Sequence, residues 1–443
     1  MDRTNSEPRG YVRYVTLGCK LNFSETSTIG RQLGILGYAK AADDKGAQVD
    51  LCVVNTCTVT EASEKKCRQT IRKLIRTYPT AKMVVTGCYA QLQADALAAI
   101  EGVSLVLGND QKGEADIHIA KLMGITEELD EAKRNVPPTP QLCAFTHSYS
   151  SENDRTRCFL KVQDGCNYFC AYCAVPYARG RSRNGSIAEL TVEAQKAIDQ
   201  GAREIILSGI NIGDFGRSTG ENLLQLLHAL DELQGDYHVR ISSVEPNLLK
   251  DEIIAFVATS HHMMPHFHIP LQSGSDKVLR LMRRRYNTAL FANRIATIKR
   301  IMPHAFIGVD VIVGMNGETE EYFQETLQFL TTQPVSQLHV FSYSERYDTD
   351  AVRYTPRVTP DQKSTRSNAL LALSRQKTLA FYRSQEGKTM NVLFEHAQPG
   401  HPIQGYSNNY IRVIAPYDEK LTNQFRTTKL GTLDEEKLAF SPA

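Results

Sequence analysis

The sequence lacks the features that would carry a protein into or across a membrane. Its 443 residues contain no run of about 18 apolar residues, the length of a spanning helix. Residues 1–10 are polar and lack the apolar core of a signal peptide. A charge excess is also missing, since 51 Lys and Arg face 49 Asp and Glu, and the net charge of +2 decides little about partners. We therefore expect a cytoplasmic protein with no membrane partner.

A short cysteine loop lacks a fourth cysteine. Cys166, Cys170 and Cys173 have the spacing Cys-x3-Cys-x2-Cys, and no fourth cysteine follows within reach. Because four thiolates normally hold an iron–sulfur cube, three leave one iron open to an outside ligand. The second Cys-x2-Cys knuckle of a zinc ribbon is absent as well. The loop therefore indicates a reactive cluster, with a structural metal loop as the alternative.

The other cysteines do not suggest disulfides. In a reducing compartment, ten cysteines are better explained as metal ligands and buried thiols. Four of them lie in contexts that predict ordinary buried or surface thiols. These are Cys52, Cys67, Cys143 and Cys158.

The first third of the chain predicts an α/β domain. Residues 11–124 alternate apolar runs with helical patterns, which indicates β/α units around an open, mostly parallel sheet. The predicted strands are residues 11–19, 49–57, 82–88 and 103–107, and a basic helix is predicted over 61–78. A polar, proline-rich stretch then predicts a linker over 135–155, which leaves 1–134 as the first domain.

A second β/α series predicts a barrel. Its strands are residues 159–163, 204–207, 239–242, 266–270, 306–313 and 337–341. Six units are too few for a closed eight-unit barrel, so we expect an open, partial (β/α)6 barrel over 156–386. The cysteine loop then follows the first strand, at the carboxyl-end face. Residues 387–443 predict a small β-barrel, with strands at 390–395, 404–413 and 424–428.

Three further cysteines each close a predicted strand of the first domain. They are Cys19, Cys57 and Cys88. Parallel strands end at the same edge of a sheet, where ligands bind, so these thiols are expected to converge as a second three-thiolate site. Gly18 and Gly87 would let the backbone approach a bulky cluster. A zinc site of the same cysteines is the alternative, as are ordinary buried thiols.

Several motifs together resemble one enzyme family nearly end to end. They are Leu17-Gly18-Cys19-Lys20-Leu21-Asn22, Asn55-Thr56-Cys57-Thr58-Val59-Thr60, Thr86-Gly87-Cys88-Tyr89, the cysteine loop with Tyr172 before its last cysteine, Arg179-Gly180-Arg181-Ser182-Arg183, and His268-Ile269-Pro270-Leu271-Gln272-Ser273-Gly274-Ser275. This combination resembles the methylthiotransferases, a branch of the radical S-adenosylmethionine (SAM) enzymes. The resemblance implies two [4Fe–4S] clusters, one binding SAM and one carrying sulfur, two SAM molecules per reaction and an external low-potential electron donor.

The resemblance also implies a substrate. Cys19, Lys20 and Asn22, with Thr58-Val59-Thr60, resemble the branch that acts on N6-threonylcarbamoyladenosine beside the tRNA anticodon. Related branches modify isopentenyladenosine in tRNA or an aspartate of a ribosomal protein. A non-catalytic RNA-binding zinc protein is the alternative from another class. We expect a monomer that binds the anticodon stem-loop.

Strand ends of the barrel are expected to hold SAM. The candidates are Tyr172, Ser208, Gly209, Asn211, Ser243, Glu245 and Gln272. The apolar strand that ends at Gly314 would meet the adenine. Asn316 stands where relatives usually carry proline, and asparagine tolerates a left-handed turn there.

Local basic and aromatic residues are expected to bind RNA. Arg179, Arg181 and Arg183 follow the cysteine loop, and phosphate binding needs local charge of this kind. The tail resembles the TRAM domain, a small RNA-binding β-barrel. This resemblance predicts base stacking by Tyr406 and Tyr410 and a phosphate contact by Arg412, although both tyrosines also suit a barrel core.

Overall fold

The computed structural model describes residues 7–44, 46–126, 134–139, 142, 144–150 and 156–443. It divides into two compact units. The first comprises Met1–Ser150, Asp164–Asn167 and Cys173–Gly185, and the second comprises Ser151–Gln163, Tyr168–Tyr172 and Ser186–Ala443. The segment around the cysteine loop is therefore divided between the two units.

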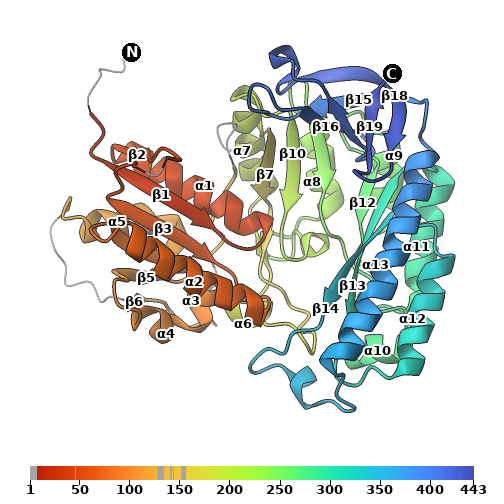
Figure 1. Ribbon diagram of the computed structural model, residues 1–443, viewed down its shortest axis with the longest axis horizontal. Helices are drawn as coiled ribbons and strands as arrows, with labels where there is room; N and C mark the ends of the chain where they lie inside the picture. Colours follow the sequence, from red (N-terminus) through yellow and green to blue (C-terminus); the bar gives the residue numbers. More distant parts are fainter. Residues whose placement is uncertain (1–6, 45, 127–133, 140–141, 143, 151–155) are drawn as a thin grey trace. The chain divides into compact units, whose positions relative to one another are not determined.

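A six-stranded parallel sheet forms the centre of the first unit, in agreement with the predicted fold class (Figure 1). Its order is β2-β1-β3-β4-β5-β6. The strands are β1 (Gly10–Thr16), β2 (Tyr38–Lys40), β3 (Leu51–Thr56), β4 (Lys82–Gly87), β5 (Leu105–Leu107) and β6 (Arg134–Asn135). The helices are α1 (Lys20–Ile35), α2 (Glu61–Thr77), α3 (Cys88–Leu92), α4 (Ala94–Ala98), α5 (Ala115–Leu122) and α6 (Val175–Arg179). The sequence did not predict β2 and β6, which are too short to show a periodic pattern.

The sheet of the first unit is covered on both faces. Every residue of β3 is buried. Cys52 and Val54 lie in a hydrophobic cluster with α2, whereas Leu51 and Val53 lie in a second cluster with α1. A strand that is buried on both faces has a continuous apolar run in its sequence. The sequence predicted β3 because it contains such a run.

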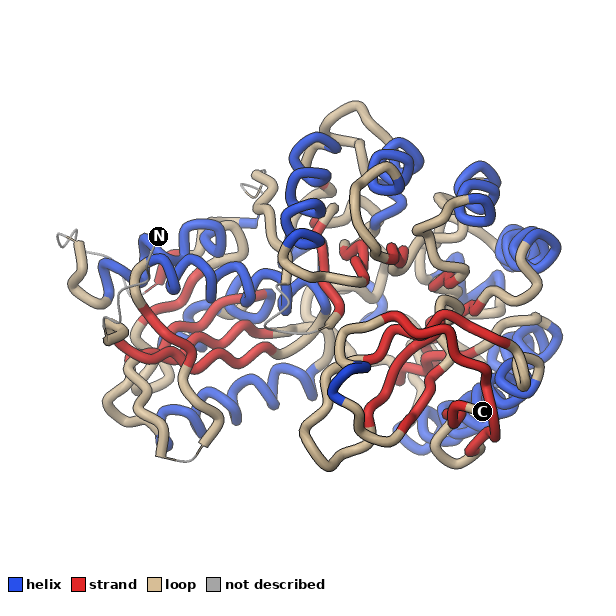
Figure 2. Tube along the Cα trace, turned by 90° about the horizontal axis from the view of Figure 1, so that it is seen from above, coloured by secondary structure: helices blue, strands red, loops and turns tan. Residues whose placement is uncertain are grey.

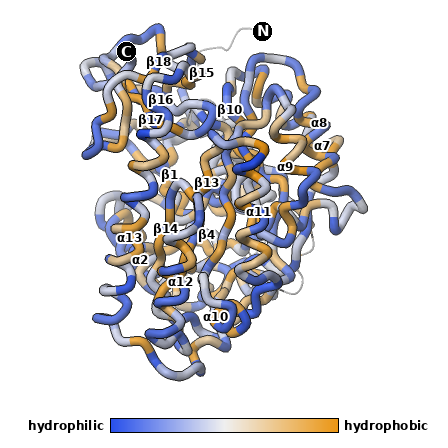
Figure 3. The backbone as a smooth tube through the Cα atoms, turned by 90° about the vertical axis from the view of Figure 1, so that its right-hand side faces the viewer, coloured by the Kyte–Doolittle hydropathy of each residue, from blue (hydrophilic) through white to orange (hydrophobic). Residues whose placement is uncertain are grey.

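The second unit contains the predicted open barrel of six parallel strands. They are β7 (Arg157–Lys161), β10 (Glu204–Ser208), β11 (His238–Ile241), β12 (His266–His268), β13 (Phe306–Val313) and β14 (Gln337–Ser342). Two sheets, β11-β10-β7 and β12-β13-β14, are connected by isolated parallel bridges such as Ser243 with His268. Figure 3 shows hydrophobic segments along β13. Two short strands, β8 (Gln163–Asp164) and β9 (Arg183–Asn184), flank the cysteine loop along the chain.

Helices connect successive barrel strands. They are α7 (Ile187–Asp199), α8 (Leu223–Asp231), α9 (Asp251–Thr259), α10 (Asp276–Leu281), α11 (Thr288–Ile301) and α12 (Glu320–Thr332), and α13 (Pro360–Arg383) leads to the tail. Among the described residues, no helix is both long and apolar enough to cross a membrane.

The tail is a closed five-stranded barrel (Figure 2). Its strands are β15 (Thr389–Phe394), β16 (Ile403–Ser407), β17 (Arg412–Ala415), β18 (Phe425–Asp434) and β19 (Ala439–Pro442). The prediction of one strand over 404–413 was wrong, because a turn separates β16 from β17. Tyr410 has a φ of 66° in this turn, which a continuous strand does not allow.

The cysteines outside the two triads behave as predicted where they are described. Cys52, Cys67 and Cys158 are at most 1% exposed. Cys143 lies outside the described residues.

Candidate active site

The first triad lies at the carboxyl edge of three adjacent strands. Cys57 directly follows β3, and Cys88 follows β4 as the first residue of α3. Cys19 does not close β1, which ends at Thr16, but caps the start of α1. The pKa of the Cys57 thiol is raised to about 12, mainly by burial and in part by the nearby thiols of Cys88 and Cys19. The predicted convergence of the three thiols is therefore seen in the first unit.

Glycines bring the backbone close to the triad. Gly18 has a φ of +113°, and a Cβ there would lie 3.1 Å from the Cys57 Sγ. Gly87 has a φ of +106°, and a Cβ there would lie 2.3 Å from the backbone oxygen of Thr56. Only glycine fits this conformation and this space.

We expect Gly87→Ala to destabilise the protein by more than about 2 kcal/mol, because it combines a disfavoured φ with a backbone clash. Chemical unfolding would measure the change. Gly34→Ala in α1 is the matched control, since a Cβ there meets nothing within 4 Å. The control should stabilise the helix by about 0.5–1 kcal/mol. Equal stability of the two variants would contradict the expectation.

A buried arginine lies against the first triad. The Nε of Arg179 donates a hydrogen bond to the Cys88 Sγ at 3.2 Å. Its Nη1 donates to Glu25 Oε1 at 2.9 Å and to Asp164 Oδ1 at 3.0 Å. Its Nη2 donates to Asn22 Oδ1 at 2.7 Å. Arg179 therefore joins one thiol to a network of ion pairs within the first unit.

Two further basic side chains join this network. Lys112 Nζ lies 2.5 Å from Glu25, and Arg183 Nη2 lies 3.0 Å from Asp164. Burial lowers the pKa of Lys112, and Glu25 opposes this. Thiols lose their protons when they bind a metal centre, so a cation beside Cys88 stabilises the bound form.

Two of the three arginines predicted to bind RNA have other partners. Arg179 and Arg183 are 1% and 5% exposed, and both are paired with carboxylates inside the first unit. The prediction that Arg179 and Arg183 bind RNA is therefore corrected, because both side chains are buried and an RNA phosphate cannot reach them. Arg181 is exposed and stays a predicted RNA contact.

The cysteine loop contributes residues to both units. Cys166 and Cys173 belong to the first, where the Cys166 backbone NH donates to the Gly180 carbonyl at 3.0 Å. Cys170 belongs to the second, where Arg284 Nη1 donates to its Sγ at 3.0 Å. Burial raises the pKa of the Cys170 thiol, and Arg284 partly opposes this.

Arg284 also pairs with Glu245, which is one of the residues predicted to hold SAM. The Arg284 side chain is 3% exposed and the Glu245 side chain 14%. Burial raises the pKa of Glu245, and the arginine lowers it. The sequence did not reveal this pair, because its members lie 39 residues apart.

The end of β10 presents an unsatisfied polar side chain. Asn211 is 3% exposed, and among the described residues neither its Nδ2 nor its Oδ1 has a hydrogen-bond partner. Gln163 Oε1 accepts from the backbone NH groups of Ile210 and Asn211 at 2.9 and 2.8 Å, which holds this turn. Ser208 is buried and bonds the Ile206 carbonyl at 3.2 Å. A buried, unsatisfied amide indicates a ligand that completes it.

The remaining SAM candidates lie near other strand ends. Ser243 Oγ is 2.6 Å from His268 Nδ1. Gln272 has a φ of 68°, and its backbone NH donates to the Asp310 carbonyl at 2.8 Å. Tyr172 packs against a hydrophobic cluster that contains Met282. Gly209 allows no side chain, since a Cβ would lie 2.5 Å from Ile212.

Asn316 holds its loop through its side chain and not through a left-handed turn. Positive φ values occur at Gly314 and Gly317 instead. Asn316 Nδ2 donates to Glu345 Oε1 at 3.0 Å and to the Ala351 carbonyl at 3.2 Å. The Asn316 side chain therefore links its loop to Glu345 and Ala351.

The tail tyrosines contact other parts of the second unit. Tyr406 and Tyr410 stack with ring centroids 5.0 Å apart. The Arg157 guanidinium lies 4.9 Å from the Tyr406 ring, and that of Arg240 lies 5.0 Å from the Tyr410 ring. Arg412 Nη2 donates to Gln404 at 2.9 Å. Base stacking and phosphate binding by these tail residues stay predictions.

Known proteins resemble this chain over nearly its whole length. Residues 160–330 match the radical SAM superfamily, and residues 11–108 match the uncharacterized protein family UPF0004. The threonylcarbamoyladenosine tRNA methylthiotransferase MtaB of Bacillus subtilis is 37% identical over 429 residues, covering 95% of this chain and 93% of that protein. The protein of the same name from Aquifex aeolicus is 34% identical and covers 86% and 92%. The chain belongs to the radical SAM methylthiotransferase family.

Other relatives and structures agree with this assignment. The tRNA-2-methylthio-N(6)-dimethylallyladenosine synthase of Desulfitobacterium hafniense is 30% identical to this methylthiotransferase and covers 92% of each chain. The radical SAM methyltransferase TsrM of Kitasatospora setae shares its fold, with a TM-score of 0.55, 14% identity and coverage of 75% and 74%.

The residues of this methylthiotransferase fit the family's cofactors, which are [4Fe–4S] clusters and SAM. Cys88 accepts a hydrogen bond from Arg179, whose charge also acts on Cys19, and a cation at this place suits an anionic thiolate cluster. The unsatisfied amide of Asn211 suits a polar cofactor at the end of β10.

Proposed function

We propose that this methylthiotransferase acts on tRNA and inserts a methylthio group at C2 of N6-threonylcarbamoyladenosine next to the anticodon. The supporting observation is the 37% identity with the Bacillus subtilis methylthiotransferase named for that nucleoside, over 95% of the chain. The dimethylallyladenosine synthase from Desulfitobacterium is more distant, at 30%. Isopentenyladenosine in tRNA is therefore the second candidate substrate.

In this proposal each cysteine triad holds one [4Fe–4S] cluster. The loop cysteines Cys166, Cys170 and Cys173 bind the cluster that also binds SAM, and Cys19, Cys57 and Cys88 bind the cluster that carries sulfur. Together with two SAM molecules, these cofactors supply the methyl group, the sulfur and the radical that removes the C2 hydrogen.

The protein's own residues orient and stabilise these groups. Arg179 donates to Cys88, and Arg284 donates to Cys170, so each triad has a buried cation that offsets thiolate charge. Asn211 offers both an amide donor and an acceptor to SAM at the end of β10. Exclusion of water around these buried groups protects a radical from side reactions.

Residues with access to solvent would bind the anticodon stem-loop. The exposed Arg181 is the candidate beside the loop, and the half-buried Arg412, Tyr406 and Tyr410 are the candidates in the tail. The adenine would have to leave its stack to reach the cofactors, as in other enzymes that act on bases. We further propose that the enzyme works in the cytoplasm as a monomer and takes electrons from an external low-potential donor.

Nucleoside mass spectrometry would test the substrate. Expression of the chain in a host without this activity should convert N6-threonylcarbamoyladenosine in tRNA to its 2-methylthio derivative and leave isopentenyladenosine unchanged. Methylthiolation of isopentenyladenosine alone would show that the enzyme belongs to the branch that acts on isopentenyladenosine in tRNA. Unchanged tRNA with a methylthiolated ribosomal aspartate would contradict the tRNA proposal, while the family would stand.

A further inference from the structure

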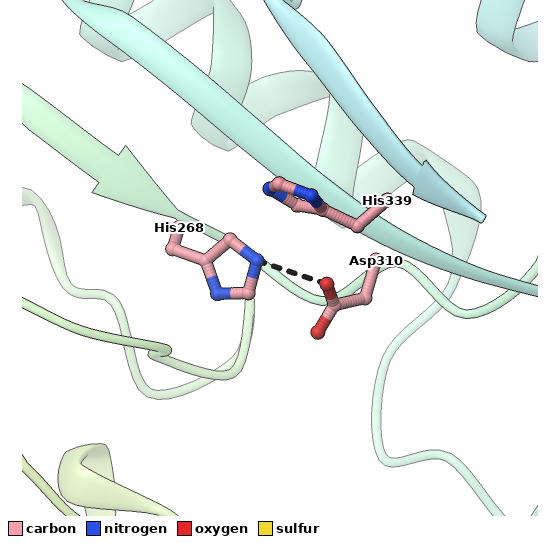
Figure 4. A group of neighbouring side chains, drawn as sticks. All are labelled: His268, Asp310 and His339. Carbon is pink, nitrogen blue, oxygen red and sulfur yellow. Dashed lines mark hydrogen bonds and ion pairs between the residues drawn. The ribbon is translucent and has the colours of Figure 1, made fainter. Parts of the chain in front are cut away.

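Three metal-ligating side chains that belong to neither cysteine triad meet on neighbouring strands of the barrel. His268 ends β12, Asp310 lies in β13 and His339 lies in β14. Asp310 and His339 are paired residues of adjacent strands, and His268 is paired with Gly308, two residues before Asp310. Residues two apart on a strand share a face. The three side chains therefore project from one face of a three-stranded sheet (Figure 4).

Their ligand atoms lie close enough to share one ion. The ligand atoms of the three side chains all lie within 4.8 Å of one another. His268 Nε2 is 2.9 Å from Asp310 Oδ1, and Figure 4 shows both beside the imidazole of His339. Ligands about 2.1 Å from a metal ion are separated by about 3.0–3.4 Å, so each pair of ligand atoms would have to approach by at most about 1.8 Å to bind one ion.

Two neighbouring residues, Ser243 and Gly308, favour this arrangement of the three side chains. Ser243 Oγ lies 2.6 Å from His268 Nδ1 and so can fix the ring with Nε2 directed at Asp310. Gly308 leaves room for both imidazoles, since a Cβ there would lie 3.2 Å from His268 Cδ2 and 3.3 Å from His339 Nε2. The backbone of Gly308 is extended, a conformation that any residue can adopt. Glycine is therefore favoured at this position because a side chain would crowd the two imidazoles, not because of its backbone angles.

The ligands are accessible, as a metal site with open positions requires. The His268 and Asp310 side chains are 19% and 22% exposed, and His339 is half-buried. Two imidazoles and one carboxylate bind divalent transition metals and leave other coordination positions open.

We propose that His268, Asp310 and His339 form a binding site for one divalent transition-metal ion, separate from the iron–sulfur clusters. Zinc is the probe, because it binds imidazole and carboxylate and has no redox chemistry of its own.

The test uses the full chain with its clusters reconstituted under anaerobic conditions. Equilibration with buffered Zn²⁺, followed by elemental analysis, should give about one zinc per chain in addition to cluster iron. His339→Gln should weaken zinc binding by about 100-fold or more with unchanged iron. Gly308→Ala keeps all three ligands but should weaken binding at least about tenfold by crowding the rings. His228→Gln, which removes an exposed imidazole of α8, is the control and should change nothing.

X-ray absorption at the zinc edge of the unmodified protein provides a test that needs no variant. Nitrogen and oxygen neighbours at about 2.0–2.1 Å are expected, without a sulfur shell at about 2.3 Å. A sulfur shell would place the zinc on cysteines and overturn the proposal. The same conclusion would follow if no zinc bound, or if His339→Gln bound it as well as the unmodified chain.

Discussion

Alanine at Cys170 or at Cys88 is expected to abolish the methylthio product, but to do so at different steps. Each change should lower the iron content from about eight to about four per chain, because each triad supplies one [4Fe–4S] cluster. Cys170→Ala should also abolish the reductive cleavage of SAM, since its cluster binds SAM. Cys88→Ala should still cleave SAM to 5′-deoxyadenosine while forming no methylthio nucleoside.

Iron and sulfide analysis and chromatography of 5′-deoxyadenosine would separate the two outcomes. Cys158→Ala is the control, because Cys158 is a buried thiol of β7 outside both triads. It should keep full iron and full activity. Full iron content in the Cys88→Ala protein would show that Cys88 is not a cluster ligand. Loss of SAM cleavage in both variants would contradict the proposal that one cluster cleaves SAM and the other carries sulfur.

Arg179→Met is expected to lower the free energy of unfolding by about 3–5 kcal/mol, because it removes buried hydrogen bonds to Glu25, Asp164 and Asn22. Arg179 bonds Glu25 and Asp164 and is 1% exposed. The variant should also lose the iron of the first triad, since its side chain cannot donate to Cys88.

Urea unfolding and iron analysis would measure the two effects of Arg179→Met. Arg181→Met is the matched control, since Arg181 is exposed and two residues away. Its stability should change by less than about 0.5 kcal/mol. A stable Arg179→Met protein with full iron would show that the arginine contributes little to either the fold or the cluster.

The position of the first triad could be predicted from the sequence, whereas its charged surroundings could not. Parallel strands have a common carboxyl edge, so three cysteines after three apolar runs were enough to predict convergence. Arg179 and Glu25 are 154 residues apart, and no local pattern connects them. The same arginine lies in a basic run, which explains why the sequence predicted contact with RNA.

Other differences have equally local causes. The cluster of His268, Asp310 and His339 depends on which residues are paired across β12, β13 and β14, and periodicity along one strand gives no such register. The turn at Tyr410 was missed because it adopts a positive φ, which is uncommon for tyrosine.

The division of the loop segment between the units has a consequence during synthesis. The first unit includes residues up to 185, although its sheet lies within the first 135 residues. A ribosome adding about 5–20 residues per second needs about 8 to 30 s to pass from Glu25 to Arg179. Lys112 is added 87 residues after Glu25, so for the last part of that interval the nascent chain holds Glu25 and Lys112 without Arg179. The charge balance beside Cys88 is therefore completed only after translation has passed the cysteine loop.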